Sequence, residues 1–267
     1  MYRFKVDKNC NKCVLGKSSG GFACSGAISG QSEVEFSQVK LIVVGSFPAG
    51  KDLSAKLSLA PNYDRKSAPD SNKAPVSGGD YLRYCLESCI DRNKTFPKEF
   101  TPIDEFTYFT NAIKCSPQRG RDKITIVDKH RKACTNNWLI NELAMFSSDV
   151  PILACGTDAV KGVLGIESKL YELRNKVNYY KSHPVIVTTN PSEWEKYVMR
   201  YVPSIEESRG YVVKLMQNGT FLKYKKSIDK GIGVTKWKEL PGSPLYFIKQ
   251  DLMLIRDEVI KYIKENK

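Results

Sequence analysis

Four runs of hydrophobic residues along the chain predict buried β-strands. They read VKLIVVG from Val39, FTYFTNAIKC from Phe106, VPILACG from Val150 and HPVIVTTN from His183. Each run is largely apolar and contains β-branched residues, which is typical of strands that are covered on both faces of a parallel sheet. The hydrophobic pattern therefore predicts a sheet that is built from these four segments.

Helical spacing of the apolar residues follows the strands. Apolar positions recur every three or four residues in VDKHRKACTNNWLINELAMF and in TDAVKGVLG, and the fourth strand leads into a predicted helix at residues 193–201. Strands that alternate with helices are typical of a parallel sheet with helices on both faces. We therefore expect an α/β fold of three layers, α/β/α, around a central, mostly parallel four-stranded sheet.

The pattern changes after residue 201. Two strand-like segments, YVVKLMQ and TFLKYKK, flank Asn218-Gly219, and this arrangement predicts a small β-hairpin with a tight two-residue turn. The chain then continues into an amphipathic helix whose apolar face consists of Leu252, Ile255, Val259 and Ile263. We expect one domain over residues 1–267, in which residues 204–243 are an insertion that carries this basic hairpin.

Charge narrows the choice of partner. The chain has 267 residues, with 42 lysines and arginines against 29 acidic residues, and its formal net charge is +13. Such an excess favours a polyanionic partner, with nucleic acid first. No apolar run approaches the roughly 20 residues of a membrane helix, and the first residues lack the apolar stretch of a secretory signal. We expect a cytoplasmic, monomeric protein with nucleic acid as its partner and no membrane. On charge alone, an anionic membrane surface is the second choice of partner.

The cysteines suggest a metal centre. Without an export signal, eight cysteines are better explained by metal ligation than by disulfides, because the cytosol keeps thiols reduced. Cys10 and Cys13 form a C-x2-C pair, Cys115 ends the second strand, and Cys134 lies on the next helix. Four thiolates suit either tetrahedral zinc or a four-iron, four-sulfur cluster, and the spacing alone does not separate the two.

The loops after the strands are the expected place for the chemistry. Ligands of open α/β sheets bind beyond the carboxyl ends of the strands. We therefore expect the loops at residues 46–52, 111–115 and 190–192 to converge.

The order of the motifs identifies a family resemblance. Along the chain they read CNKC, VVGSFPAGKD, TNAIKCSPQRGR, KACTNNWL, ILACGTDAVKGVLG and VIVTTNPSEW. This order resembles the iron-sulfur, family-four branch of the uracil-DNA glycosylase superfamily, over residues 10 to about 201. The resemblance implies a uracil-DNA glycosylase-like fold and a 4Fe-4S cluster, rather than zinc, held by Cys10, Cys13, Cys115 and Cys134.

The same resemblance suggests base-binding and catalytic residues. Asn111 matches the asparagine that hydrogen-bonds the base edge in this family. Ser46 stands where the family has an acidic residue, and Asn190 stands where it has the histidine of a His-Pro-Ser motif. The stacking aromatic residue of the family has no counterpart at its usual place, so Phe47 is a candidate for that role, with packing in the core as the alternative.

The reaction assigns possible roles to these residues. Breaking the bond between base and deoxyribose builds negative charge on the base and positive charge on the sugar. Asn190 can donate a hydrogen bond to the base oxygen, and Asp52 or Ser46 would lie near the attacking water. The alternative for Asp52 is a cap of the helix that follows it. No lysine stands at an obvious nucleophile position, so we expect a monofunctional glycosylase.

Basic and aromatic residues beside the motifs are candidates for DNA contacts. The resemblance places a DNA-facing loop after the third cluster cysteine and a DNA-wedging loop after the last motif. The candidates in these loops are Arg119, Arg121, Lys123, Ser192 and Trp194.

Three departures from the family pattern bear on the substrate. Smaller or neutral groups at the acidic, histidine and aromatic positions predict a wider pocket. We therefore expect a DNA glycosylase for a modified or bulky pyrimidine, for example in hypermodified phage DNA, which would make it an antiviral defence enzyme. The alternatives are a uracil-DNA glycosylase of base-excision repair and a non-catalytic relative that binds a modified base or an abasic site.

Overall fold

The computed structural model describes a part of the chain that contains the four predicted strands. The described residues are 10, 12–13, 15, 27–28, 35–48, 82, 86, 106–116, 118–119, 122–123, 125–191 and 243–266. The predicted helix at residues 193–201 and the predicted hairpin within residues 204–243 lie outside this part. No helix among the described residues combines the length and the apolar character that a membrane span requires.

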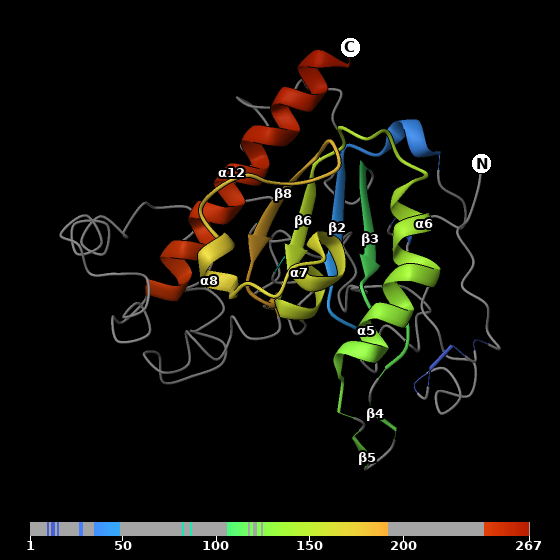
Figure 1. The fold of residues 1–267 in the computed structure, drawn as a ribbon. Helices are drawn as coiled ribbons and strands as arrows, with labels where there is room; N and C mark the ends of the chain where they lie inside the picture. Colours follow the sequence, from blue (N-terminus) through green and yellow to red (C-terminus); the bar gives the residue numbers. More distant parts are fainter. Residues whose placement is uncertain are drawn as a thin grey trace, which may run out of the picture.

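The four predicted strands form the parallel centre of the sheet, which confirms the α/β fold. They are β2 (Leu41–Gly45), β3 (Thr107–Asn111), β6 (Ile152–Cys155) and β8 (His183–Thr188), and neighbours in the order β3-β2-β6-β8 pair in parallel. Nearly all of their residues are buried because helices cover both faces (Figure 1).

The sheet is wider than the predicted four strands. Two short strands, β1 (Ala27–Ile28) and β7 (Asn178–Tyr180), pair antiparallel with β3 and β8 and make a six-stranded, mixed sheet. The edge strand β7 is only partly buried, and Tyr179 at its centre is exposed. Such a short, half-exposed strand lacks the continuous apolar run from which the central strands were predicted. A separate pair, β4 (Gln118–Arg119) and β5 (Asp122–Lys123), forms a two-stranded ribbon.

One group of helices covers the face of the sheet to which Tyr108 points. It comprises α5 (Asp128–Cys134), the π-helical turn η3 (Thr135–Leu139), α6 (Ile140–Leu143) and α7 (Thr157–Leu164), with α8 (Leu170–Leu173) further along the chain. The hydroxyl groups of Tyr108 and Thr110 both donate to Glu142 on α6. Side chains two apart in a strand share a face, so this face of β3 packs against α6.

The long helix α12 (Ser243–Glu265) covers the opposite face beside β8 (Figure 1). Its Asp251 lies near Cys155 and Thr188. The charge of Asp251 raises the pKa of the Cys155 thiol, and the Thr188 side chain lowers the pKa of Asp251. By the alternation of side chains along β6 and β8, these two residues point away from the α6 face. The apolar positions predicted for this helix are buried in the core, namely Leu252, Ile255, Val259 and Ile263.

A buried ion pair anchors α12 to the segment after α8. Arg174 donates from Nε to Asp251 Oδ2 at 2.7 Å, and its Nη2 lies 2.6 Å from the same oxygen. The backbone N–H of Asn175, which has a left-handed φ of 58°, donates to Asp251 Oδ1 at 3.4 Å. Burial raises the pKa of Asp251 to about 6, against the opposing effect of the Arg174 charge.

Candidate functional site

The residues predicted for the site follow neighbouring strands of the sheet. Ser46 comes directly after β2, Asn111 is the last residue of β3, and Asn190 lies two residues beyond β8. Since the strand order is β3-β2-β6-β8 and all four are parallel, these positions lie along one edge of the sheet. The register pairs Gly45 with Asn111 directly.

Gly156, directly after β6, brings Ser46 and Asn190 close to one another. A Cβ atom placed on Gly156 would lie 3.0 Å from Ser46 Oγ and 3.2 Å from Asn190 Cβ. Ser46 is buried, and its hydroxyl donates to the carbonyl of Cys155 at 3.5 Å. The backbone N–H of Gly156 donates to Thr188 O at 2.8 Å, which ties the ends of β6 and β8 together. The two predicted catalytic side chains therefore flank a single glycine.

Gly156 also needs a backbone conformation that favours glycine, because its φ is +90°. We expect Gly156→Ala to lower the free energy of unfolding by roughly 2–5 kcal/mol, from backbone strain and from crowding against Ser46 and Asn190. Gly165, at the other end of α7, is the matched control, since it has φ +67° but no atom within 4 Å of an added Cβ.

Gly165→Ala carries only the backbone strain and should cost about 1–2 kcal/mol. Denaturant unfolding of the two variants measures the difference. Equal losses would mean that Ser46 and Asn190 move aside without cost and do not pack tightly on Gly156.

The side chain of Asn111 is fully buried, and neither of its amide atoms has a hydrogen-bond partner within the described part of the chain. The loop that follows it is held to β2, because Ala112 N–H donates to Gly45 O at 2.8 Å and Ile113 N–H donates to Ser46 O at 3.0 Å. An unsatisfied buried polar group costs about 1–3 kcal/mol. An amide offers one acceptor and two donor hydrogens, so Asn111 is suited to a planar, polar ligand.

Three of the four predicted metal-ligating cysteines gather beside this loop. Cys115 and Cys134 form a small buried cluster with Leu15 and Ile113, and the half-buried Cys13 packs against it. Cys10 is buried but is not among the residues of this cluster. All four are free thiols. Within the described part of the chain, no three cysteine, histidine or acidic side chains stand ready to hold a metal ion.

The buried environment of Cys134 favours the neutral thiol, although one backbone N–H donates to its sulfur. Lys114 N–H donates to Cys134 Sγ at 3.2 Å. Burial raises the pKa of this thiol to about 12, while the hydrogen bond and charge of Lys114 lower it and the thiols of Cys115 and Cys13 raise it. A thiol with this pKa is protonated at neutral pH, and a metal centre is a partner that stabilises the thiolate form.

Phe47 packs against the same cluster of Leu15, Ile113, Cys115 and Cys134, and it is half-buried. Its ring therefore lies between the loop after β2 and the cysteines. This position agrees with the packing alternative, and the exposed remainder of the side chain leaves the stacking role as a prediction.

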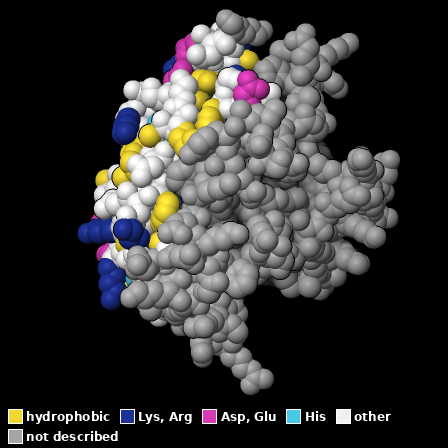
Figure 2. Space-filling view, turned by 90° about the vertical axis from the view of Figure 1, so that its right-hand side faces the viewer, with side chains coloured by type: hydrophobic (Ala, Val, Ile, Leu, Met, Phe, Trp, Pro, Cys, Tyr) yellow, Lys and Arg dark blue, Asp and Glu magenta, His cyan; other side chains and the backbone are white. Residues whose placement is uncertain are grey.

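The other predicted site residues are described in part or not at all. Asp52, Arg121, Ser192 and Trp194 lie outside the described residues. For Arg119 and Lys123 the structure describes the backbone, in which Arg119 pairs with Asp122 and Gln118 with Lys123. On the described part of the face in Figure 2, Lys and Arg side chains are dispersed among polar and hydrophobic ones and form no single basic patch.

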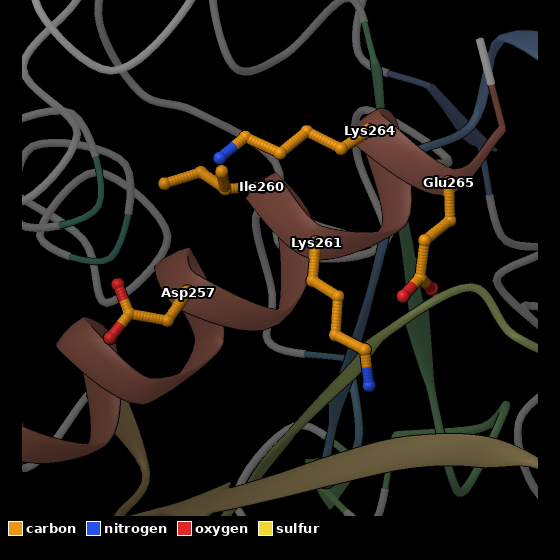
Figure 3. Close-up of a pocket in the computed structure, with 5 residues that line it drawn as sticks. All are labelled: Asp257, Ile260, Lys261, Lys264 and Glu265. Atoms are coloured by element: carbon orange, nitrogen blue, oxygen red, sulfur yellow. The ribbon is translucent and has the colours of Figure 1, made fainter.

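A separate hollow of about 340 Å³ lies on α12, away from these loops. Figure 3 shows its lining on one stretch of that helix, namely Asp257, Ile260, Lys261, Lys264 and Glu265. None of the predicted site residues lines it.

Sequence reasoning missed three residues that shape the site. Gly156 could have been noticed as the glycine that ends the run VPILACG, just as Gly45 ends the first run. Lys114, directly before Cys115 in the loop after β3, and Glu142 on α6 form a fully buried ion pair. A lysine inside the otherwise apolar AIKC segment is a signal for the first of these partners, but nothing in the sequence identifies the second.

Comparison with known families agrees with this arrangement. The family model of the uracil DNA glycosylase superfamily matches residues 32–205, which is well over half of the chain. The matched segment contains Ser46, Gly156 and Asn190 at the ends of their strands, and also Asn111. No curated protein matches the chain. Members of this superfamily are DNA glycosylases, which are hydrolases that act on DNA. The chain belongs to the uracil-DNA glycosylase superfamily.

Proposed function

We propose that the protein is a monofunctional DNA glycosylase that flips a pyrimidine out of DNA and hydrolyses the bond between the base and deoxyribose. The observation that supports this proposal is the fully buried Asn111 amide, for which the described residues provide no hydrogen-bond partner. It stands at the end of β3, in the segment that matches the superfamily. Such a group has its hydrogen bonds left for a ligand, and the ligand of this superfamily is DNA.

The amide of Asn111 is chemically matched to the edge of a pyrimidine. A uracil-like base presents a carbonyl acceptor next to an N–H donor, and an asparagine side chain presents a donor next to an acceptor. Flipping the base out of the stack costs a few kcal/mol, which is offset by contacts in the pocket and to the DNA backbone. A buried, already oriented amide limits the entropy lost on binding.

In our proposal Ser46 and Asn190 act on the same reacting centre. Their closeness to Gly156 supports this, since a Cβ atom added there would lie 3.0 Å from Ser46 Oγ and 3.2 Å from Asn190 Cβ. In our proposal Asn190 donates a hydrogen bond to the base oxygen on which negative charge develops. Ser46 is a hydrogen-bonding group near the attacking water and carries no charge. Asp52 would supply the carboxylate that faces the developing positive charge on the sugar.

The substrate we favour is a modified or bulky pyrimidine. Serine in place of a carboxylate and asparagine in place of histidine, both at positions that flank Gly156, replace charged or larger groups by neutral or smaller ones. A role against phage with hypermodified DNA would follow from such a substrate. Excision of uracil in base-excision repair is the alternative.

The iron-sulfur subtype is proposed on the cysteines. Cys13, Cys115 and Cys134 lie in or against one buried cluster, and Cys10 is joined to Cys13 by the C-x2-C spacing. Together they would hold a 4Fe-4S cluster, with zinc as the alternative, since both metals accept four thiolates. The centre would act as a structural crosslink between the N-terminal segment and the loop after β3.

DNA contacts are proposed for the segment that follows Cys115. The β4–β5 ribbon extends beyond α5 (Figure 1) and carries Arg119 and Lys123, with Arg121 between its strands. In our proposal these residues neutralise phosphates, and Ser192 and Trp194 contact the strand beside the flipped base. Loss of one such cation should reduce the salt dependence of DNA binding by about one phosphate contact.

A panel of DNA duplexes tests the function. The duplexes contain uracil, 5-hydroxymethylated pyrimidines or glucosylated pyrimidines, and free base and strand breaks are measured separately. We expect base release without strand cleavage, and faster release of an enlarged pyrimidine than of uracil. Release of uracil alone would overturn the proposal that the pocket is wide enough for an enlarged pyrimidine. Tight DNA binding without release of any base would instead identify a non-catalytic relative.

The metal centre has its own test, which does not depend on activity. Protein purified without oxygen should show visible absorbance and bound iron, and Cys134→Ser should lower the iron content by about tenfold or more. Cys155→Ser is the control, since Cys155 is a fully buried thiol inside β6, outside the cysteine cluster. Bound zinc and a colourless protein would support the zinc alternative, and loss of iron in both variants would point to general unfolding.

A further inference from the structure

A fully buried ion pair joins the predicted base-binding loop to helix α6. Lys114 Nζ contacts Glu142 Oε2, and neither side chain has any exposed surface. Lys114 lies in the loop after β3, three residues beyond Asn111 and directly before Cys115. Glu142 lies on α6, and none of the roles proposed above involves either partner.

The pair is part of a satisfied hydrogen-bond network. Tyr108 Oη donates to Glu142 Oε1 at 2.7 Å, and Thr110 Oγ1 donates to Glu142 Oε2 at 2.8 Å. Lys114 Nζ also donates to Thr110 Oγ1 at 2.5 Å. The Glu142 carboxylate therefore accepts hydrogen bonds from β3 and from the loop after it. These bonds join α6 to the strand that carries Asn111.

Lys114 contacts the helical segment a second time, through its backbone. Its N–H donates to Cys134 Sγ at 3.2 Å, at the end of α5. One residue thus binds Cys134 by its main chain and Glu142 by its side chain.

The π-helical turn η3 allows both contacts to be made. Cys134 and Glu142 are eight residues apart, and in a regular α-helix, at about 100° per residue, they would point in directions roughly 80° apart. A π turn accommodates one extra residue, so the pair gains the alignment of residues seven apart, within about 20°. The five π-helical residues between them therefore bring both side chains to the face that Lys114 contacts.

We propose that Lys114 and Glu142 are positioning residues, which hold the loop of residues 111–115 against the helix so that Asn111 is oriented for the base and Cys115 lies beside Cys134. This inference rests on the proposed function. A buried ion pair can often be replaced by uncharged groups without loss of stability. A network of donors and acceptors at fixed angles, by contrast, orients the groups that it joins.

The decisive experiment separates stability from orientation. Lys114→Met alone leaves the Glu142 carboxylate buried without its cation, and the Tm should fall by roughly 10 °C. In the double variant Lys114→Met/Glu142→Gln no charge is left, and the glutamine amide can still bond Tyr108 and Thr110. We expect the double variant to recover most of the lost Tm but to keep a kcat/KM for base release that is about 10–100-fold below that of the wild type.

A second readout does not depend on catalysis. Amide hydrogen exchange of the peptide covering residues 107–116 should be at least about tenfold faster in the double variant than in the wild type. The matched control carries the same substitutions, Lys161→Met/Glu167→Gln, in a partly exposed ion pair on and after α7. It should alter neither base release nor this exchange rate.

The outcomes separate the inference from the function. A double variant that recovers Tm, base release and slow exchange together would overturn the positioning role and leave the pair a contributor to stability only. If the double variant does not fold, Glu142→Asp replaces it, because it keeps the charge pair but withdraws the carboxylate by one methylene. Normal base release and exchange in Glu142→Asp would also overturn the inference. A wild-type protein that releases no base refutes the proposed function, and the exchange rates then decide on the positioning role.

Discussion

Asn111→Leu should lower base release by about 10²–10³-fold and leave the folded protein as stable as before, or more stable. The loss in rate is the one expected for removing a preorganised hydrogen-bonding group from a reacting centre. We expect unchanged stability because the buried Asn111 amide has no hydrogen-bond partner among the residues that the structure describes. Leucine has a similar size and carries no polar atom, so it removes a desolvation cost of about 1–3 kcal/mol.

Base release and denaturant unfolding of the same variant measure the two effects. Asn141→Leu is the matched control, because Asn141 is an exposed residue of α6 whose amide bonds the carbonyl of Asn137 at 3.2 Å. It should leave base release unchanged. A large loss of stability in Asn111→Leu would mean that the amide is needed for folding, and full activity would remove Asn111 from the site. Opposite changes in rate and stability at one residue are typical of binding sites.

Asp251→Ala should lower the free energy of unfolding by about 3–5 kcal/mol. The substitution leaves the guanidinium of Arg174 buried without its carboxylate, which is the costly way to break a buried pair. It also releases α12 from the segment after α8. Asp257→Ala on the same helix is the control, because Asp257 pairs with Arg256 at the exposed surface and should contribute at most about 1 kcal/mol. Equal losses in both variants would contradict the anchoring role.

The pH dependence of stability provides an independent check of the same residue. Burial raises the pKa of Asp251 to about 6 from the ordinary aspartate value of 3.8. Between these values the folded protein holds a proton that the unfolded chain has released, so the contribution of Asp251 to the free energy of unfolding falls as the pH rises. Relative to Asp251→Asn, the wild type should lose up to about 3 kcal/mol between pH 4 and pH 6 and change little above pH 6.

The regular parts of this protein could be predicted from local sequence. The four apolar runs became β2, β3, β6 and β8, and the apolar stripe of the last helix is buried. Burial on both faces demands continuous apolar residues, so a central strand is visible in the sequence. The short, half-exposed β7 meets no such demand and was missed. A helix was expected over residues 127–146, and the π-helical turn within it was not foreseen.

The sequence by itself determined the four central strands and the superfamily, and it supplied the candidate site residues, because each depends on residues close together in the chain. Tertiary structure alone decided which of them touch. Ser46 and Asn190 both come close to Gly156 because three parallel strands end side by side. Lys114 contacts Glu142, 28 residues away, because α6 packs against the face of β3 that carries Tyr108 and Thr110. Such contacts follow from how sheet and helices pack, which no local pattern of hydrophobic residues encodes.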